Sequence, residues 1–161
     1  MDENQTLEIL KEAMNLEDIS SEGARVSIVP MGAEHPEGYQ ALEIRNGAID
    51  LDRFSENECT EILAPEMLDY LSFEDINPVV SSLIKKMRKS ATLTIGGIDS
   101  RMMARGIIDG AIPVYELNQA VFSRRSITDI NLTKELLIAL GLKIVSARLK
   151  GLKYEIKATR D

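Results

Sequence analysis

The sequence predicts one soluble α/β domain over residues 1–161, with a partly parallel, Rossmann-like sheet. Three observations lead to this prediction. Short apolar and β-branched runs alternate with amphipathic helical segments, a pattern typical of parallel strands joined by helical crossovers. Two runs near the end of the chain are separated only by a tight turn at Lys150-Gly151, so one terminal strand must be antiparallel. The length and the apolar content of 44% are those of one globular domain.

The first half of the chain is expected to hold a helix followed by four short strands. Apolar residues recur at helical spacing over residues 5–16, and residues 1–20 are interpreted as an N-terminal helix and loop. The four strands are predicted at residues 25–29, 39–44, 48–51 and 60–64. Only a short loop separates the first two strands, whereas a parallel crossover with a helix needs about a dozen residues. The first crossover helix is therefore expected to be missing.

The second half is expected to alternate helices with strands. Asn77 is predicted to cap a helix that has Pro78 at its first position and basic residues at its end. Asn131 is predicted to cap the last helix, which Gly141 ends. Helices are expected at residues 100–110, 113–122 and 133–140, and strands at residues 91–95, 142–149 and 153–159.

Composition excludes several classes of function. The formal net charge of −7 argues against a nucleic-acid backbone or an anionic membrane as the main partner, because phosphate binding needs clustered cations. A single cysteine cannot form an internal disulfide, and one histidine with one cysteine argues against a zinc site. No apolar run approaches the roughly 20 residues that span a bilayer. We therefore expect a cytoplasmic protein without a metal.

Several stretches that follow one another in a fixed order carry a resemblance to a known family. They are Gly38–Glu43, Thr60–Ser72, Ile84–Arg88, Leu93–Ile95, Ala139–Val145 and Leu152–Arg160. Together they give a strand that ends on an acid, a strand followed by an acidic helix start, a helix with a basic end, a further strand and a closing hairpin. In this order, over residues 38–160, the sequence resembles the class I S-adenosylmethionine-dependent methyltransferases.

The resemblance implies a methyltransferase-type three-layer sandwich, with S-adenosylmethionine held at the carboxyl edge of the sheet. It places Met31 and Gly32 in the loop after the first strand, where the backbone approaches the cofactor. Glu43 is expected to bind the ribose hydroxyl groups and Asp50 the adenine. Glu66 follows a later strand, where the family places substrate and catalytic groups. No catalytic residue is assigned.

The sequence departs from the family pattern at its glycine motifs. Pro30 stands where the first glycine of the cofactor loop is expected, and a proline removes a backbone donor and adds bulk at that point. Pro65-Glu66 replaces the frequent Ser-His pair, and Lys89-Ser90-Ala91 replaces a Pro-Gly-Gly turn. Two hypotheses follow. One is a reduced methyltransferase of weak or lost activity, and the other is an inactive relative that serves binding or assembly through residues 100–122 and the N-terminal helix, self-association included.

Each candidate residue also has an interpretation without function. Glu43 could be a solvated carboxylate at a strand end, Asp50 a turn residue, and Glu66 an acid that stabilises the first turn of a helix. A nucleotide-sugar or dinucleotide binder on a similar sheet is a third hypothesis, but the sequence has no GxGxxG motif.

Other reactive or anion-binding residues have little support from their neighbours. His35 lies in a loop without an evident partner, and Cys59 has no adjacent base that would lower its pKa. Gly96-Gly97 is predicted to be a strand-end turn, because the GK[ST] of a phosphate loop does not follow it. Arg124-Arg125 is interpreted either as an anion-binding pair or as part of a solvated loop.

Overall fold

The computed structural model describes residues 23–161, so the expected helix over residues 5–16 lies outside the described residues. The strands are β1 Ala24–Pro30, β2 Gln40–Ile44, β3 Cys59–Ala64, β4 Met87–Ile98, β5 Leu142–Lys150 and β6 Lys153–Arg160. The helices are α2 Phe73–Lys86, α3 Ser100–Ile108, α4 Val114–Phe122 and α5 Ile130–Ala139. Two short 3-10 helices are η1 Leu51–Arg53 and η2 Met67–Tyr70.

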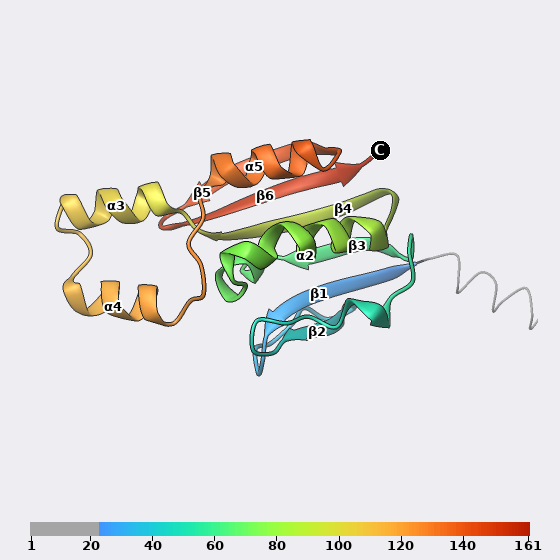
Figure 1. Cartoon of the computed structure of the whole chain (residues 1–161), viewed down its shortest axis with the longest axis horizontal. Coiled ribbons are helices and arrows are strands. Elements are labelled where there is room, and N and C mark those ends of the chain that lie inside the picture. The colour runs from blue at the N-terminus through green and yellow to red at the C-terminus, as the bar shows by residue number, and fades with distance from the viewer. Residues whose placement is uncertain (1–22) are drawn as a thin grey trace, which may run out of the picture.

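The six strands form one sheet in the order β2-β1-β3-β4-β6-β5 (Figure 1). Strands β2, β1, β3 and β4 are parallel to one another, and β6 is antiparallel to both β4 and β5. This confirms the prediction of a mostly parallel Rossmann-like sheet with an antiparallel C-terminal hairpin. It also confirms that β1 and β2 are joined without a helix. The carboxyl ends of the four parallel strands meet at one edge of the sheet, where ligands bind in such folds.

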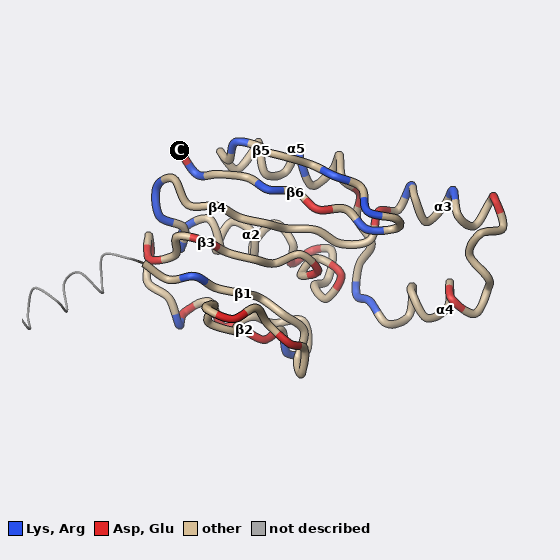
Figure 2. Tube along the Cα trace, turned by 180° about the vertical axis from the view of Figure 1, so that it is seen from behind, with Lys and Arg blue, Asp and Glu red and all other residues tan. Residues whose placement is uncertain are grey.

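Helices α2 and α5 pack over the same face of the sheet (Figure 1), and the view from behind shows the strands in front of them (Figure 2). One row of paired residues across the sheet faces these helices and is buried: Val26, Ile62, Leu93 and Ala158. The next row points the other way and is more polar: Ser27, Leu63, Thr94 and Lys157. Residues 23–161 therefore supply the sheet and one helical layer of the expected sandwich.

Strand β4 runs through Gly96 and Gly97, so the prediction that these glycines form a turn after the strand is wrong. A Cβ on Gly96 would lie 2.1 Å from the carbonyl oxygen of Tyr154 and 2.8 Å from that of Pro65. A Cβ on Gly97 would lie 2.7 Å from Oδ1 of Asp69. The two glycines are required because neighbouring segments approach β4 more closely than any side chain permits.

Helix α2 begins at Phe73, and the prediction of a start at Pro78 capped by Asn77 is wrong. Pro78 lies inside the helix, where it removes one backbone hydrogen bond to the preceding turn. Glu74 and Asp75 occupy the first turn instead, and acids are favourable at that end of the helix dipole. The helix packs its apolar face on the sheet, and this packing outweighs the local cost of the proline.

Two other predictions fail for local reasons. Residues 48–51 do not form a strand, because Asn46 and Gly47 take positive φ angles in a tight turn and η1 follows directly. Asn131 does not cap α5. The cap is Asp129, whose side chain accepts a hydrogen bond of 2.8 Å from the backbone nitrogen of Leu132.

The buried phenol of Tyr154 makes the stability of the fold depend on alkaline pH. Its hydroxyl group forms hydrogen bonds of 2.6 Å with the hydroxyl groups of Thr128 and Thr133. Burial raises the pKa of Tyr154 from 10 to about 12, although these hydrogen bonds act in the opposite direction. The folded state holds the proton more tightly than the unfolded state. The resulting stability is therefore present below pH 10 and is lost as the pH rises through about 12.

We predict that the free energy of unfolding of the wild type falls between pH 10 and 12, and that Tyr154→Phe shows a smaller fall over the same range. Chemical denaturation at a series of pH values measures this difference. Other alkaline groups titrate equally in both proteins, so the comparison isolates the phenol. Parallel plots of the free energy of unfolding against pH for the two proteins would contradict the assignment of this pH dependence to Tyr154.

Candidate functional site

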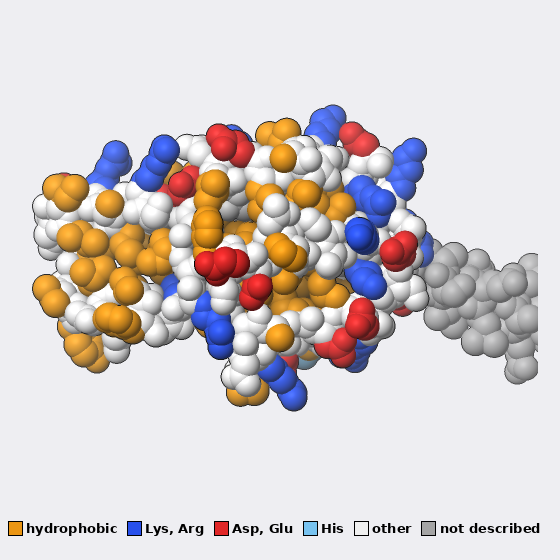
Figure 3. All heavy atoms as spheres, in the orientation of Figure 1, with side chains coloured by type: hydrophobic (Ala, Val, Ile, Leu, Met, Phe, Trp, Pro, Cys, Tyr) orange, Lys and Arg blue, Asp and Glu red, His pale blue; other side chains and the backbone are white. Residues whose placement is uncertain are grey.

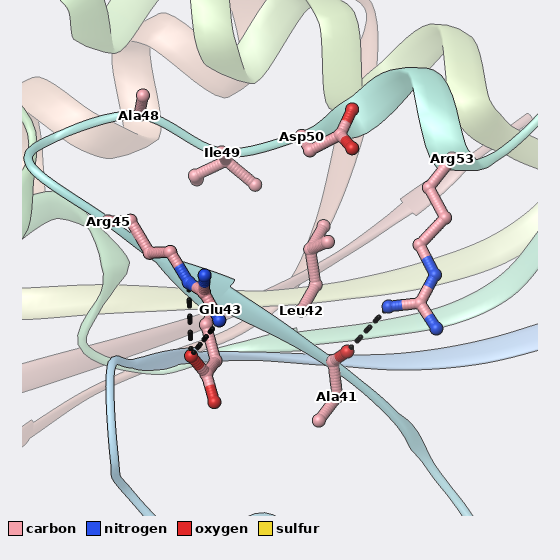
Figure 4. A pocket seen from close by; sticks show the side chains of 8 residues that line it. All are labelled: Ala41, Leu42, Glu43, Arg45, Ala48, Ile49, Asp50 and Arg53. Carbon is pink, nitrogen blue, oxygen red and sulfur yellow. Dashed lines mark hydrogen bonds and ion pairs between the residues drawn. The ribbon is translucent and has the colours of Figure 1, made fainter.

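A cavity of about 560 Å³ lies beside the edge strand β2 (Figure 4). It is lined by Ala41, Leu42, Glu43, Arg45, Ala48, Ile49, Asp50 and Arg53. We call it the β2 cavity. Its volume falls within the range of about 300–1,000 Å³ that is typical of small-molecule sites.

The turn after β2 explains why this cavity forms. The backbone of Arg45 and Ala48 pairs through two hydrogen bonds of 2.9 Å around the Asn46-Gly47 turn, which sends the chain back past β2. Arg53 then donates a hydrogen bond of 3.2 Å from Nη1 to the carbonyl oxygen of Ala41. The returning segment is tied to β2 at its two ends and stands away from the strand between them.

Glu43 and Asp50 both line the cavity, on opposite sides of the β2 ribbon (Figure 4). Asp50 belongs to the returning segment and is exposed, with the apolar side chains of Leu42 and Ile49 beside it. Glu43 points to the other side, where Oε2 accepts hydrogen bonds of 3.1 and 3.3 Å from Arg45. The site therefore offers two carboxylates at its margins and an apolar wall between them.

The ion pair of Glu43 and Arg45 does not block the site. The two side chains are 35% and 70% exposed, and an exposed pair contributes only about 0–1 kcal/mol. A ligand that donates hydrogen bonds to Glu43 can therefore displace or share this partner at little cost. The hydroxyl groups of a sugar are donors of this kind.

The other expected residues lie outside this cavity. Met31 and Gly32 form the turn after β1, and Met31 is exposed. Pro30 pairs with Ile44, so this turn is a neighbour of the end of β2 without lining the cavity. Glu66 lies beyond β3, where its carboxylate forms an ion pair with Lys153 at the start of β6. Of the five residues expected at the cofactor site, the fold therefore brings two, Glu43 and Asp50, to one cavity.

A buried ion pair that the sequence did not reveal holds the carboxyl edge together. Asp69 is 2% exposed, and its Oδ1 accepts a hydrogen bond of 2.9 Å from the backbone nitrogen of Ile98. Its Oδ2 accepts one of 3.1 Å from Nε of Arg124. Burial raises the pKa of Asp69, and the two hydrogen bonds oppose that rise. No local pattern marks Asp69, because its partners are distant in sequence.

Arg125, the neighbour of this pair, lies against the turn that borders the β2 cavity. A Cβ on Gly47 would lie 2.9 Å from Nη1 of Arg125, so the guanidinium rests on the backbone of that turn. The backbone nitrogen of Arg125 donates a hydrogen bond of 2.8 Å to the carbonyl oxygen of Asp69, which fixes the residue in place. The exposed guanidinium is thus a cation beside the cavity.

Other candidate reactive groups take no part in a site. Cys59 is buried, and burial raises its pKa to about 11, so the thiolate that a nucleophile requires is not formed at neutral pH. His35 lies exposed in the loop between β1 and β2. Among residues 23–161 no three side chains are grouped so as to hold a metal ion, and no helix in that range is long and apolar enough to cross a membrane.

Solved structures with a similar fold include S-adenosylmethionine-dependent methyltransferases. The enzyme from Archaeoglobus fulgidus has a TM-score of 0.56 at 12% identity, with 95% of this chain and 94% of that chain covered. A possible histamine N-methyltransferase from Thermotoga maritima has a TM-score of 0.57 at 12% identity, over 85% and 82% of the two chains. A methyltransferase from Methanosarcina mazei has a TM-score of 0.56 at 10% identity, over 89% and 85%.

The chain has the methyltransferase fold. TM-scores of 0.56–0.57 at identities of 10–12% show the fold alone, so any activity has to be argued from the residues of the site. No protein-family model matches the sequence, and no curated protein matches it. The methyltransferase fold is therefore present in a strongly diverged sequence.

We predict that Asp69→Ala lowers the free energy of unfolding by about 1–3 kcal/mol, because it leaves the buried N–H group of Ile98 without its acceptor and removes the carboxylate from the partly buried Arg124. Glu155→Ala removes an exposed ion pair with Lys150 and should cost less than about 1 kcal/mol. Urea denaturation of the two variants and the wild type measures both values. Equal effects of the two substitutions would show that the Asp69 pair does not hold this edge.

Proposed function

We propose that this chain binds S-adenosylmethionine, with the adenosine end in the β2 cavity, and that its methyl-transfer activity is weak or lost. The observation that carries the proposal is that Glu43 and Asp50, the two residues assigned to ribose and adenine, line one cavity at the margin of the sheet. A structural neighbour, the 1,6-didemethyltoxoflavin-N1-methyltransferase of Burkholderia thailandensis, was solved with S-adenosylhomocysteine and has a TM-score of 0.52 at 13% identity.

The groups around the β2 cavity fit the parts of adenosine. Leu42 and Ile49 supply apolar surface for the flat base, and Asp50 can accept a hydrogen bond from its amino group. Glu43 can accept hydrogen bonds from the ribose hydroxyl groups on the other side of the strand. A nucleoside that lies across the end of β2 meets all three features.

The cationic side of the site suits the amino-acid end of the cofactor. Arg125 stands at the turn that borders the β2 cavity, and a guanidinium binds a carboxylate through two parallel hydrogen bonds. The turn Met31-Gly32 lies beside the end of β2 and is proposed to border the bound cofactor. The assignment of Glu66 to the substrate side of the site remains a prediction.

The proposal that methyl transfer is weak or lost rests on the few groups that the carboxyl edge of the sheet provides for the cofactor and the substrate. The sulfonium of the bound cofactor supplies an electrophilic methyl group, so the protein mainly has to align a nucleophile with it. Here the connection from β1 to β2 has no helix whose N-terminus could face the cofactor, and Pro30 removes a backbone donor. Glu66 is already paired with Lys153.

Isothermal titration with S-adenosylmethionine and S-adenosylhomocysteine tests the proposal. We predict binding in the micromolar range, about −8 kcal/mol, and at least a tenfold loss, about 1.4 kcal/mol, for Glu43→Ala. The matched control is Glu61→Ala, which removes a partly exposed carboxylate from β3, where it pairs with Arg25. Absence of heat at millimolar ligand, or equal affinity of the Glu43 variant and the wild type, would contradict the proposal.

A second titration tests the role of Arg125. We predict that Arg125→Ala weakens S-adenosylhomocysteine several-fold and leaves the affinity for adenosine unchanged, because adenosine lacks the carboxylate. Arg53→Ala, which changes a cation on the opposite side of the cavity, is the comparison variant. An equal loss of both ligands in the Arg125 variant would assign Arg125 to the structure of the turn.

A second candidate function is an inactive binding or assembly subunit. The observation that favours it is the apolar surface of α3 and α4, described below, which the sheet does not cover. We further propose that residues 1–161 form one domain and that the protein is cytoplasmic, as its composition predicts. The assembly role and cofactor binding are compatible.

A further inference from the structure

Helices α3 and α4 form a projection beyond the carboxyl edge of the sheet, which we call the helical arm (residues 100–122) (Figure 1). Met103 is the buried residue of α3, and α4 has none. Large apolar side chains of the arm are exposed instead: Ile107, Ile108, Val114, Tyr115 and Phe122. Ile108 and Phe122 are more than 80% exposed. In the space-filling view the arm carries a broad apolar surface (Figure 3).

The arm is firmly anchored where it leaves and rejoins the domain. Asp99 is buried, and its Oδ1 accepts hydrogen bonds of 3.0 Å from the backbone nitrogens of Arg101 and Met102 at the start of α3. Its Oδ2 accepts one of 2.9 Å from the backbone nitrogen of Ile130 at the start of α5. Both ends of the excursion therefore meet at one carboxylate, and the pair of Asp69 and Arg124 adds a second anchor.

The two helices need more apolar contact than the domain gives them. Each has nine residues, and isolated helices shorter than about 12–15 residues are marginal in water. The contact at Gly106 of α3 is with the segment that joins the two helices, where a Cβ would lie 2.5 Å from Cδ1 of Ile112. Most of their remaining apolar surface faces outward. A contiguous exposed patch of this kind marks an interaction site.

A second copy of the chain fits this surface. The arm carries two cations, Arg101 and Arg105 on α3, and two anions, Asp109 and Glu116. It is thus electrically neutral in a chain of net charge −7, so two arms can meet without the repulsion that other surfaces would cause. Figure 2 shows the cations on α3 and an anion on α4, so a two-fold pairing of α3 with α4 of the other copy places opposite charges together.

Size and position also favour a second copy. One side of a standard interface has about 20–30 residues, so an interface built on residues 100–122 has to use both helices of the arm. Two helical hairpins that bury one face each form a four-helix bundle, an arrangement with its own apolar core. β1 starts at the end of the sheet opposite the arm (Figure 1), so the chain that precedes β1 joins the domain far from this surface.

We propose that the helical arm is a homodimerisation surface, in which two arms pair about a two-fold axis as a four-helix bundle. This inference rests on the second candidate function and names its partner. It is independent of cofactor binding, because Glu43 and Asp50 lie in another part of the fold.

Sedimentation equilibrium of the full chain at tens of micromolar tests the proposal. The wild type should have twice the monomer mass, and the double variant Ile108→Glu with Phe122→Glu should be monomeric. The matched control is Ile138→Glu, which places the same charge on an apolar residue of α5 that is 58% exposed and should leave the dimer intact. A monomeric wild type, or a dimeric double variant, overturns the proposal.

A charge-exchange experiment distinguishes loss of the interface from unfolding of the arm. Arg101→Glu with Arg105→Glu should weaken the dimer at least tenfold, and addition of Glu116→Arg should restore much of the affinity, which an unfolded arm could not do. Failure of this restoration overturns the pairing of α3 with α4 of the other copy. Titration with S-adenosylhomocysteine in the same samples separates the two proposals: a dimer that gives no heat refutes cofactor binding alone, and a monomer that binds refutes dimerisation alone.

Discussion

The structure depends on the close approach of three segments to β4 at Gly96 and Gly97. The carbonyl oxygens of Pro65 and Tyr154 and the carboxylate of Asp69 occupy the space that two side chains would otherwise fill. This approach lets Asp69 reach the backbone of β4 and Arg124 together, so it fixes the end of the central strand and the segment that follows the helical arm. The two glycines thus serve the packing inside β4, where the sequence predicts a turn after the strand.

This constraint links the scaffold to the proposed site. The backbone of Arg125 is held by Asp69, and its guanidinium rests on Gly47 at the turn that borders the β2 cavity. A cation is therefore placed beside the cavity by the backbone carbonyl of the same residue whose carboxylate orders the sheet edge. The turn after β1, by contrast, has Pro30 where the resemblance predicts the first glycine of the cofactor loop. The fold is therefore easier to identify in this chain than the cofactor motif.

Local patterns predicted the fold well where the chain forms regular elements. All strands except the one predicted at residues 48–51, together with the closing hairpin and the compressed first unit, followed from alternation, turn residues and loop length. The start of α2 did not, because burial of the helix outweighs the local preference of Pro78 for a first position. Gly96 and Gly97 were placed in a turn, since only the packing of distant segments shows why β4 needs them.

The site was harder to predict, because its residues are distant in the sequence and come together only in the folded chain. The resemblance identified Glu43 and Asp50, and the fold brings both to the β2 cavity. It also named Glu66, which the fold pairs with Lys153 elsewhere. Arg125 gains its position through a backbone hydrogen bond to Asp69 and a contact with Gly47, both distant in the sequence, which no short motif could reveal.

The most direct test of the account is an NMR titration of the labelled protein with S-adenosylhomocysteine, in which backbone amide shifts report where the ligand lies. The account predicts that the largest changes fall on residues 41–53, which include the lining of the β2 cavity, with smaller changes at Arg125. A second, apolar cavity lies between α2 and α5, where Ile76, Leu132 and Leu136 line it. Changes confined to that cavity, or no change at millimolar ligand, would contradict the claim that the β2 cavity is the cofactor site.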